Sequence, residues 1–256
     1  MMKNFLKTSY IASIYIFLYL PVVVLITYAF NNARFSAEWH GMTLQWFTAL
    51  FQDTDLLMIT SHSLIIAVLS ATIAVILGSL GSVALFRYYF FGKQFIHGLL
   101  FVLIVVPDLV FGISLLILYS LAKIHLGFWS LLLAHVTFCL PFVVVTVLGR
   151  LSGTDKKIIE AARDLGATDS TIFFKIILPL MLPALVAGWL LSFTLSMDDV
   201  IISFFVSGPN FQILPLYIFS QVHVGITPEI NALCTLVFLL TVTFVYLAHF
   251  LLRKRA

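Results

Sequence analysis

Three aspartates interrupt stretches of the chain that are otherwise apolar: Asp108, Asp198 and Asp199. A carboxylate at the centre of a membrane-spanning helix costs roughly 2.5–3.5 kcal/mol on insertion scales, so such a residue usually faces a cavity or a partner. No Lys or Arg lies within the same apolar stretches to neutralise these groups. The residue types therefore favour binding of a cationic ligand. The alternative is a protonated or hydrogen-bonded carboxyl with a structural role.

Other polar residues in these stretches have two readings as well. Ser196, two residues before Asp198, either adds a hydroxyl acceptor to the same site or bonds its own helix. His62 and His135 are expected to pack between helices rather than to bind a ligand. Cys139 and Cys234 lie in apolar runs and are interpreted as small core residues, with no disulfide or metal site.

The elements that hold these residues are predicted to be membrane-spanning helices. The sequence is 62% hydrophobic and 10% charged, with a mean hydropathy of +1.12, whereas soluble domains carry about 25% charged residues. The first apolar run, 9–30, is long enough at 1.5 Å per residue to cross a hydrocarbon core of about 30 Å. We expect an all-α polytopic membrane protein with six transmembrane helices, at about 9–30, 61–86, 95–122, 127–149, 181–206 and 230–252.

The distribution of basic residues predicts the orientation. Cytoplasmic loops of membrane proteins carry an excess of Lys and Arg. With both termini in the cytoplasm, only Arg34 and Lys123 of the 14 basic residues lie outside. This arrangement also places the charged segment 150–179 in the cytoplasm.

The expected depths of the aspartates favour a shared site. Asp108 and Asp198 both lie about 20 Å from the inner ends of their spans at 1.5 Å per residue, so they can be neighbours at one level. Consecutive helical residues point about 100° apart, so Asp198 and Asp199 face one lumen only if the helix is distorted. Pro107 predicts such a break beside Asp108.

Several activities are not indicated. The sequence contains no G-x-x-x-x-G-K-[ST] phosphate-binding loop, and no H-E-x-x-H or G-x-S-x-G motif. We therefore expect no catalytic residues, no metal site and no ATP hydrolysis by this chain. The basic residues follow membrane topology rather than a nucleic-acid-binding face.

The segment 150–179 is predicted to form two short helices joined by a bend. Thr154 and Asp155 are placed to cap the first helix, and Gly166 lies where a left-handed residue would end it. Thr168, Asp169 and Ser170 are placed to cap the second helix, which Pro179 is expected to end. Composition alone also permits an amphipathic helix on the membrane surface.

A spaced pattern within this segment resembles a known family. It comprises Glu160-Ala161-Ala162, three residues, Gly166, nine residues, Ile176, one residue and Leu178-Pro179. This closely resembles the EAA loop of the permease subunits of ABC importers, which forms a coupling helix that docks into a groove on a cytoplasmic ATPase subunit. The resemblance implies the same coupling role for Glu160, Ala161, Ala162 and Gly166.

The resemblance extends over roughly residues 8–252. Residues 192–200, together with Pro107-Asp108 and the six-span layout, resemble the permease subunit of spermidine/putrescine ABC importers. This implies a type I permease fold, with 1–256 as one transmembrane permease domain of the inner membrane and 150–179 as its coupling loop. The implied partners are a second homologous permease subunit, a periplasmic polyamine-binding protein and a cytoplasmic ATPase dimer, which itself uses the ATP and Mg.

The same resemblance implies roles for individual residues. Asp108, Asp198 and Asp199 become candidate ammonium contacts, and Trp46 a cation–π contact near the outer mouth; an aromatic belt at the membrane interface is the ordinary alternative for tryptophans. Asp169 is implied to act in ATPase docking or substrate exit. The remaining alternatives are a permease for another cationic or small organic substrate, an ion-coupled secondary carrier, and a membrane scaffold without transport.

Overall fold

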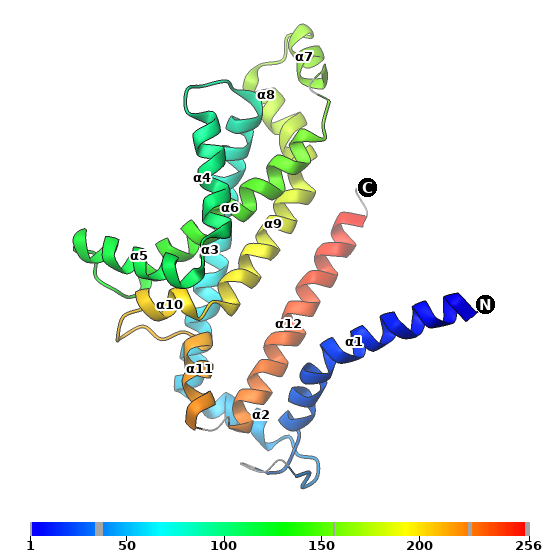
Figure 1. The fold of residues 1–256 in the computed structure, drawn as a ribbon, viewed down its shortest axis with the longest axis vertical. Coiled ribbons are helices and arrows are strands. Elements are labelled where there is room, and N and C mark those ends of the chain that lie inside the picture. Colours follow the sequence, from blue (N-terminus) through cyan, green and yellow to red (C-terminus); the bar gives the residue numbers. More distant parts are fainter. Residues whose placement is uncertain (1, 34–37, 156, 225–226, 254–256) are drawn as a thin grey trace. The chain divides into compact units, whose positions relative to one another are not determined.

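The computed structural model describes residues 2–33, 38–155, 157–224 and 227–253, which are mostly helical (Figure 1). The only β-type pairing among these residues is an isolated bridge between Asn31 and Met42. The helices are α1 (Met2–Ala29), α2 (Gln45–Gln52), α3 (Thr54–Arg87), α4 (Lys93–Val105), α5 (Asp108–Leu121), α6 (Phe128–Ser152), α7 (Lys157–Asp164), α8 (Asp169–Ile172), the π-helical turn η1 (Phe173–Ile177), α9 (Leu178–Asp198), α10 (Ile201–Val206), α11 (Leu214–Val224) and α12 (Pro228–Arg253).

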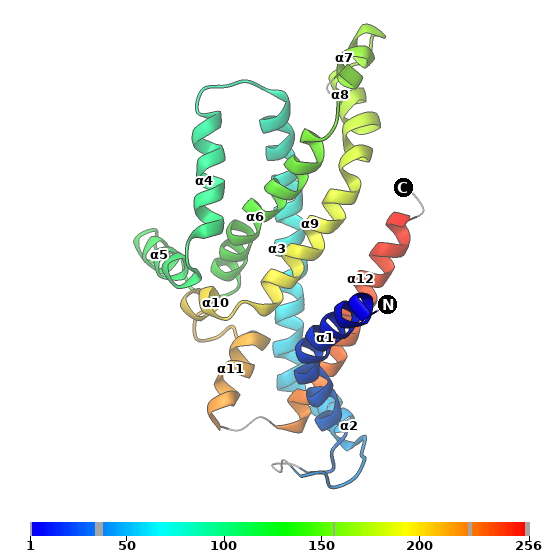
Figure 2. The same cartoon turned by 45° about the vertical axis from the view of Figure 1, so that its right-hand side comes forward.

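The chain divides at Met58–Ile59 and at Tyr217–Ile218 into two compact units. The first unit contains α1, α2 and α12, and α12 packs against both α1 and α2. The second unit contains most of α3 and everything from α4 to α10. Within it α6 and α9 run alongside each other (Figure 2).

The all-α polytopic membrane fold is confirmed. In the described residues, five helical segments are long and apolar enough to cross a membrane, and the pair α4 and α5 makes a sixth if it is counted as one bent span. The five are Lys7–Ala29, Thr54–Arg87, Phe128–Ser152, Asp169–Asp198 and Pro228–Leu247.

The predicted break at Pro107 is present in the third span. Val106 and Pro107 adopt extended ψ angles of 130° and 135°, and α4 and α5 meet there at 113°. A proline disfavours helical geometry at the residue before it and removes one backbone donor, which explains the position of the break. The expected span 95–122 is therefore two helices with Asp108 at the start of the second.

The expectation that Pro179 ends a helix is wrong, because α8, η1 and α9 run continuously from Asp169 to Asp198. The π-helical turn ends at Ile177, two residues before the proline, and its wider hydrogen bond joins the Leu178 N–H to the Phe173 carbonyl. This wider turn relieves the clash of a proline ring with the carbonyl four residues earlier. The expected span 181–206 consequently starts earlier and ends earlier, at Asp198.

Small residues on α3 allow close packing within the second unit. Ser70, Ala74 and Ser82 are fully buried, and a Cβ atom at Gly78 would lie only 2.8 Å from Val143 Cγ1 on α6. The Ser82 hydroxyl also donates to the Val144 carbonyl on α6, at 3.1 Å. These small residues allow the backbones of α3 and α6 to approach each other closely, as small residues do in membrane proteins.

Candidate functional site

Asp108 is the first residue of α5, and its side chain is exposed. The extended residues Val106 and Pro107 redirect the chain immediately before it. A carboxylate in the first turn of a helix interacts favourably with the positive end of the helix dipole. The break therefore leaves the Asp108 carboxylate exposed to a ligand and also places it where the α5 dipole stabilises its negative charge.

Asp198 is the last residue of α9 and is also exposed. The negative end of the α9 dipole adds to the charge of this carboxylate, so a cation near it is favoured. No Lys or Arg in the described part of the chain forms a salt bridge with Asp198 or Asp108. Asp198 is thus the carboxylate of this region with the least compensation from the chain itself.

The packing of α10 on α5 brings the two breaks together. A Cβ atom at Gly112 would lie 2.9 Å from Phe205 and 3.3 Å from the Ile202 Cα, so the two helices approach each other closely. Asp108 begins α5, and Asp198 and Asp199 lie just before α10, with Val200 as the intervening residue. The structure therefore brings the three predicted aspartates into one region of the second unit.

Asp199 differs from Asp108 and Asp198, because it is buried and its carboxylate accepts hydrogen bonds from the chain itself. Its backbone is extended, with φ of −69° and ψ of 119°, which separates α9 from α10. Its two oxygens accept hydrogen bonds from the Ile202 N–H (3.2 Å), the Ser203 N–H (2.8 Å) and the Ser203 hydroxyl (2.7 Å). Asp199 therefore caps the start of α10, as a carboxylate at a helix N-terminus does.

Ser196 is buried and takes part in hydrogen bonds between helices. Its hydroxyl oxygen lies 2.6 Å from His135 Nδ1 on α6 and 3.2 Å from the Ser70 hydroxyl on α3. The other ring nitrogen of His135 lies 2.9 Å from the Ser203 hydroxyl on α10. Of the residues named in advance for a ligand path, Asp108 and Asp198 are accessible, whereas Ser196 and Asp199 are enclosed.

Trp46 lies in the first unit, on α2. It is buried, and its indole N–H donates to the Asn31 carbonyl at 2.7 Å. The Asn31 side chain in turn bonds the carbonyl of Glu38 and the N–H of His40. The geometry thus gives Trp46 a role in holding the segment that joins α1 to α2, and a contact with a ligand stays a prediction.

The segment between α6 and α9 has the predicted capping. Asp155 accepts from the Lys157 N–H, and the Thr168 hydroxyl accepts from the Thr171 N–H. Gly166 has a left-handed φ of 83°. The Ala167 N–H bonds the Ala162 carbonyl and the Gly166 N–H bonds the Arg163 carbonyl, which together form a Schellman motif.

This segment divides into an inner and an outer face. Ala162 and Ala167 pack against the core cluster formed by α3, α6, η1 and α9, whereas Glu160 and Ala161 are exposed. Leu165 is 89% exposed. Glu160, Ala161 and Gly166 of the spaced pattern are thus available to another protein, whereas Ala162 faces the core of this chain.

Asp169 forms ion pairs within the chain. Its carboxylate pairs with Arg87 at the end of α3 and lies 3.6 Å from Arg163 of α7. The Arg87 side chain is only 8% exposed, while that of Asp169 is 65% exposed. Sequence reasoning did not single out Arg87, because a basic residue at the end of a span is normally explained by membrane topology.

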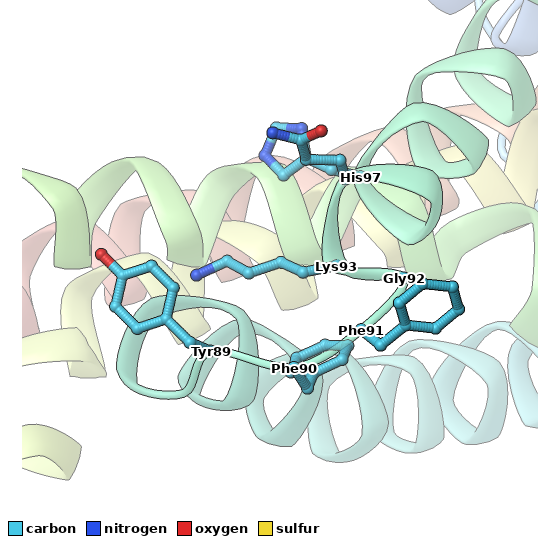
Figure 3. Close-up of a pocket in the computed structure, with 7 residues that line it drawn as sticks. Tyr89, Phe90, Phe91, Gly92, Lys93 and His97 are labelled. Carbon is cyan, nitrogen blue, oxygen red and sulfur yellow. The ribbon is translucent and has the colours of Figure 1, made fainter.

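A well-defined pocket lies away from the aspartates, at the connection between α3 and α4 (Figure 3). It has a volume of about 830 Å³ and is lined by Tyr89, Phe90, Phe91, Gly92, Lys93, Gln94 and His97. The Lys93 ammonium lies 4.9 Å from the centre of the Tyr89 ring. No carboxylate lines this pocket, so it offers a cationic ligand no counter-charge.

Comparisons with known proteins agree with this architecture. A family model described as "Binding-protein-dependent transport system inner membrane component" matches residues 70–256. The chain is 51% identical over 255 residues to the spermidine/putrescine transport system permease protein PotC of Escherichia coli (strain K12), which covers all of this chain and 97% of that protein. It is 42% identical over 231 residues to the putrescine transport system permease protein PotI of the same strain, covering 86% of this chain and 81% of that protein.

A solved structure with the same fold is that of a bacterial alginate ABC transporter in complex with an alginate pentasaccharide-bound periplasmic protein. It has a TM-score of 0.74 and 15% identity, and covers 99% of this chain and 94% of that one. At this identity the similarity concerns the fold alone.

Proposed function

This chain belongs to the binding-protein-dependent transport system inner membrane component family, and from that membership we propose that it carries polyamines inward as one permease subunit of an ATP-driven importer. It is a multi-pass protein of the inner membrane and a transport component. The observation that carries the substrate assignment is the 51% identity, over the whole chain, to a permease named for spermidine and putrescine.

The unpaired aspartates support a cationic substrate. A linear polyamine carries several separated ammonium groups, and each needs a carboxylate or an aromatic face when it leaves water. Asp108 and Asp198 are accessible and have no basic partner in the described residues. We assign direct ammonium contacts to these two residues, while Asp199 and Ser196 act by fixing the local backbone.

The partners follow from the same proposal. A periplasmic binding protein delivers the polyamine, and a second homologous permease subunit forms the other half of the path. A cytoplasmic ATPase dimer supplies the energy, and ATP and Mg are bound there rather than by this chain. The two compact units act as one permease domain, which is supported by a family match that extends through residues of both.

The orientation belongs to the proposal as well. Arg87, Arg163 and Asp169 meet at one end of the second unit, beside the exposed Glu160 and Ala161. These basic residues favour the cytoplasmic side for that end of the second unit, and Lys3, Lys7 and Arg253 beside the first and last apolar runs favour it for both termini. The coupling loop then faces the ATPase, and the aspartates lie toward the outer side.

The mechanism we propose is alternating access. Closure of the ATPase dimer on ATP moves α7, and the continuous helix from Asp169 to Asp198 transmits that motion to the aspartates. The ammonium contacts are individually weak enough to release the substrate inward.

The test is ATP-dependent uptake into vesicles that hold the assembled complex, with binding protein outside and ATP inside. We expect labelled spermidine or putrescine to accumulate only with ATP and the ATPase present. Accumulation without the ATPase would instead identify an ion-coupled carrier. If a binding protein loaded with another ligand stimulates the ATPase and no polyamine is taken up, the importer function stands and the polyamine assignment is wrong.

A further inference from the structure

A chain of hydrogen bonds crosses four helices of the second unit and ends at the break between α9 and α10. It runs from Ser70 on α3 to Ser196 on α9, then to His135 on α6, Ser203 on α10 and finally Asp199. Every member is at least nine-tenths buried, and His135 is fully buried. His135 links α9 and α10 directly, because one of its ring nitrogens bonds Ser196 on α9 and the other bonds Ser203 on α10.

The donors and acceptors fit one direction along the chain. The Ser203 hydroxyl donates to Asp199, so its oxygen is left to accept from His135 Nε2–H. His135 Nδ1 is then the acceptor of a neutral imidazole, and the Ser196 hydroxyl donates to it. The Ser70 hydroxyl supplies the bond to Ser196. A neutral histidine therefore satisfies both neighbours.

These hydrogen bonds fix the extended backbone at Asp199, between α9 and α10, rather than the helices on either side of it. Asp199 is fixed from three directions, by the Ile202 N–H and by both donors of Ser203. The Ser203 hydroxyl that contacts Asp199 is itself held by His135. Asp198 precedes Asp199 directly and has an exposed side chain, so the backbone that Asp199 fixes also sets where the Asp198 carboxylate lies.

We propose that His135 is a positioning residue for the ligand site, which acts through Ser203 and Asp199 to hold the Asp198 carboxylate in place for an ammonium group. The inference rests on the proposed polyamine function. It adds a residue that touches no substrate, and it assigns Asp199 to the support of Asp198. A polar residue that only stabilised the fold would alter the amount or melting temperature of the complex without altering substrate affinity.

The chain offers a matched control for that distinction. The Ser130 hydroxyl on α6 donates to the Val206 carbonyl at the end of α10, at 2.7 Å, and is fully buried. It therefore ties the same two helices together as His135 does, at the end of α10 remote from Asp198. Ser130→Ala removes an α6–α10 hydrogen bond, together with the local bond from the Gly127 N–H at the start of α6, without touching the break between α9 and α10.

The experiment measures KM and kcat for spermidine uptake by the reconstituted complex, per assembled transporter, for the native chain, His135→Leu, His135→Gln and Ser130→Ala. We expect His135→Leu to raise KM about tenfold or more, with a change in kcat of about threefold or less. His135→Gln, whose amide N–H can donate to Ser203, should recover part of the affinity. Ser130→Ala should leave KM within about twofold of native.

A second variant covers the case in which His135→Leu does not assemble. Ser203→Ala breaks the same chain between His135 and Asp199 with a smaller change of volume, and it should raise KM in the same way. In the double variant Ser203→Ala/His135→Gln, the increase in KM should not exceed that of the more affected single variant, because both changes interrupt the same series of hydrogen bonds.

An unchanged KM in the assembled His135 and Ser203 variants would overturn the positioning role, as would an equal increase in Ser130→Ala. The native complex separates this failure from that of the proposed function: if it transports no polyamine, the substrate assignment falls. If the native complex transports spermidine and the His135 and Ser203 variants keep its KM, the positioning inference alone falls.

Discussion

Gly166 ends α7 in a left-handed conformation, and replacing it should uncouple ATP hydrolysis from transport. Its φ is 83°, and no atom lies within 4 Å of the position that a Cβ atom would take. The cost of a side chain there is therefore conformational rather than steric. A left-handed residue other than glycine costs roughly 1–2 kcal/mol, and asparagine tolerates this region better than other residues do.

The magnitude follows for a graded series. At about 1.4 kcal/mol for each factor of ten, Gly166→Ala should reduce the population of the Schellman turn by roughly 5- to 30-fold relative to alternative turns. Gly166→Asn should have a smaller effect and Gly166→Val a larger one, since a β-branched residue rarely adopts this conformation. Gly153→Ala is the control, because Gly153 has a φ of −79° and its Cβ would make only ordinary contacts.

The assay is the ratio of polyamine molecules imported to ATP molecules hydrolysed in reconstituted vesicles. We expect the ratio to fall in the order asparagine, alanine, valine, with Gly153→Ala near native. Equal ratios for the asparagine and valine variants, or a native ratio for both, would show that the left-handed turn does not set the angle of the coupling helix.

Two further predictions concern packing and charge, and both are read from the melting temperature of the purified complex. Gly78→Leu should destabilise the chain by about 1–3 kcal/mol, because the new side chain would collide with Val143. Gly98→Leu is the control, since no atom lies within 4 Å of its Cβ position. Equal decreases in melting temperature for the two variants would contradict the close approach of α3 and α6. Asp169→Ala should lower the melting temperature more than Arg87→Met does. The first change leaves the buried guanidinium of Arg87 without its carboxylate partner, whereas the second leaves only a solvent-exposed carboxylate. A larger decrease for Arg87→Met would contradict this account.

The features predicted correctly from the sequence are those set by local rules. Gly166 and Thr168 were identified from the geometry that glycine and threonine favour at helix ends, and Pro107 from the donor that proline lacks. The apolar runs gave the spans because lipid requires long helices with satisfied backbones. Each of these conclusions depends on residues within a few positions of one another.

The features that were missed depend on contacts between distant residues. Pro179 looked like a helix end, but the π-helical turn before it accommodates the ring, and sequence pattern does not indicate such a turn. His135 was expected to pack between helices and does so, but its hydrogen-bond partners were not identified, because they lie 61 and 68 positions away. The one available signal was the need of a buried imidazole for two hydrogen-bond partners, together with the serines that other apolar segments provide.

The role of Asp169 illustrates the same limit. The sequence placed it in the coupling segment, where a role toward the ATPase or in substrate exit was implied. The structure pairs it with Arg87, which is 82 residues away, and with Arg163. This ion pair joins the coupling segment to the end of α3, and a direct contact with the ATPase stays a prediction.

The central claim is that accessible carboxylates in the membrane-spanning region bind the ammonium groups of a polyamine. Uptake of labelled spermidine at low concentration tests it most directly, for the native complex, Asp198→Asn, Asp108→Asn and the control Asp55→Asn, an exposed aspartate at the start of α3. A lost charged contact is worth about 1.5–3 kcal/mol, so we expect uptake to fall at least tenfold in Asp198→Asn, less in Asp108→Asn and little in Asp55→Asn, with ATPase assembly intact in all. Native uptake in both Asp198→Asn and Asp108→Asn would contradict the account.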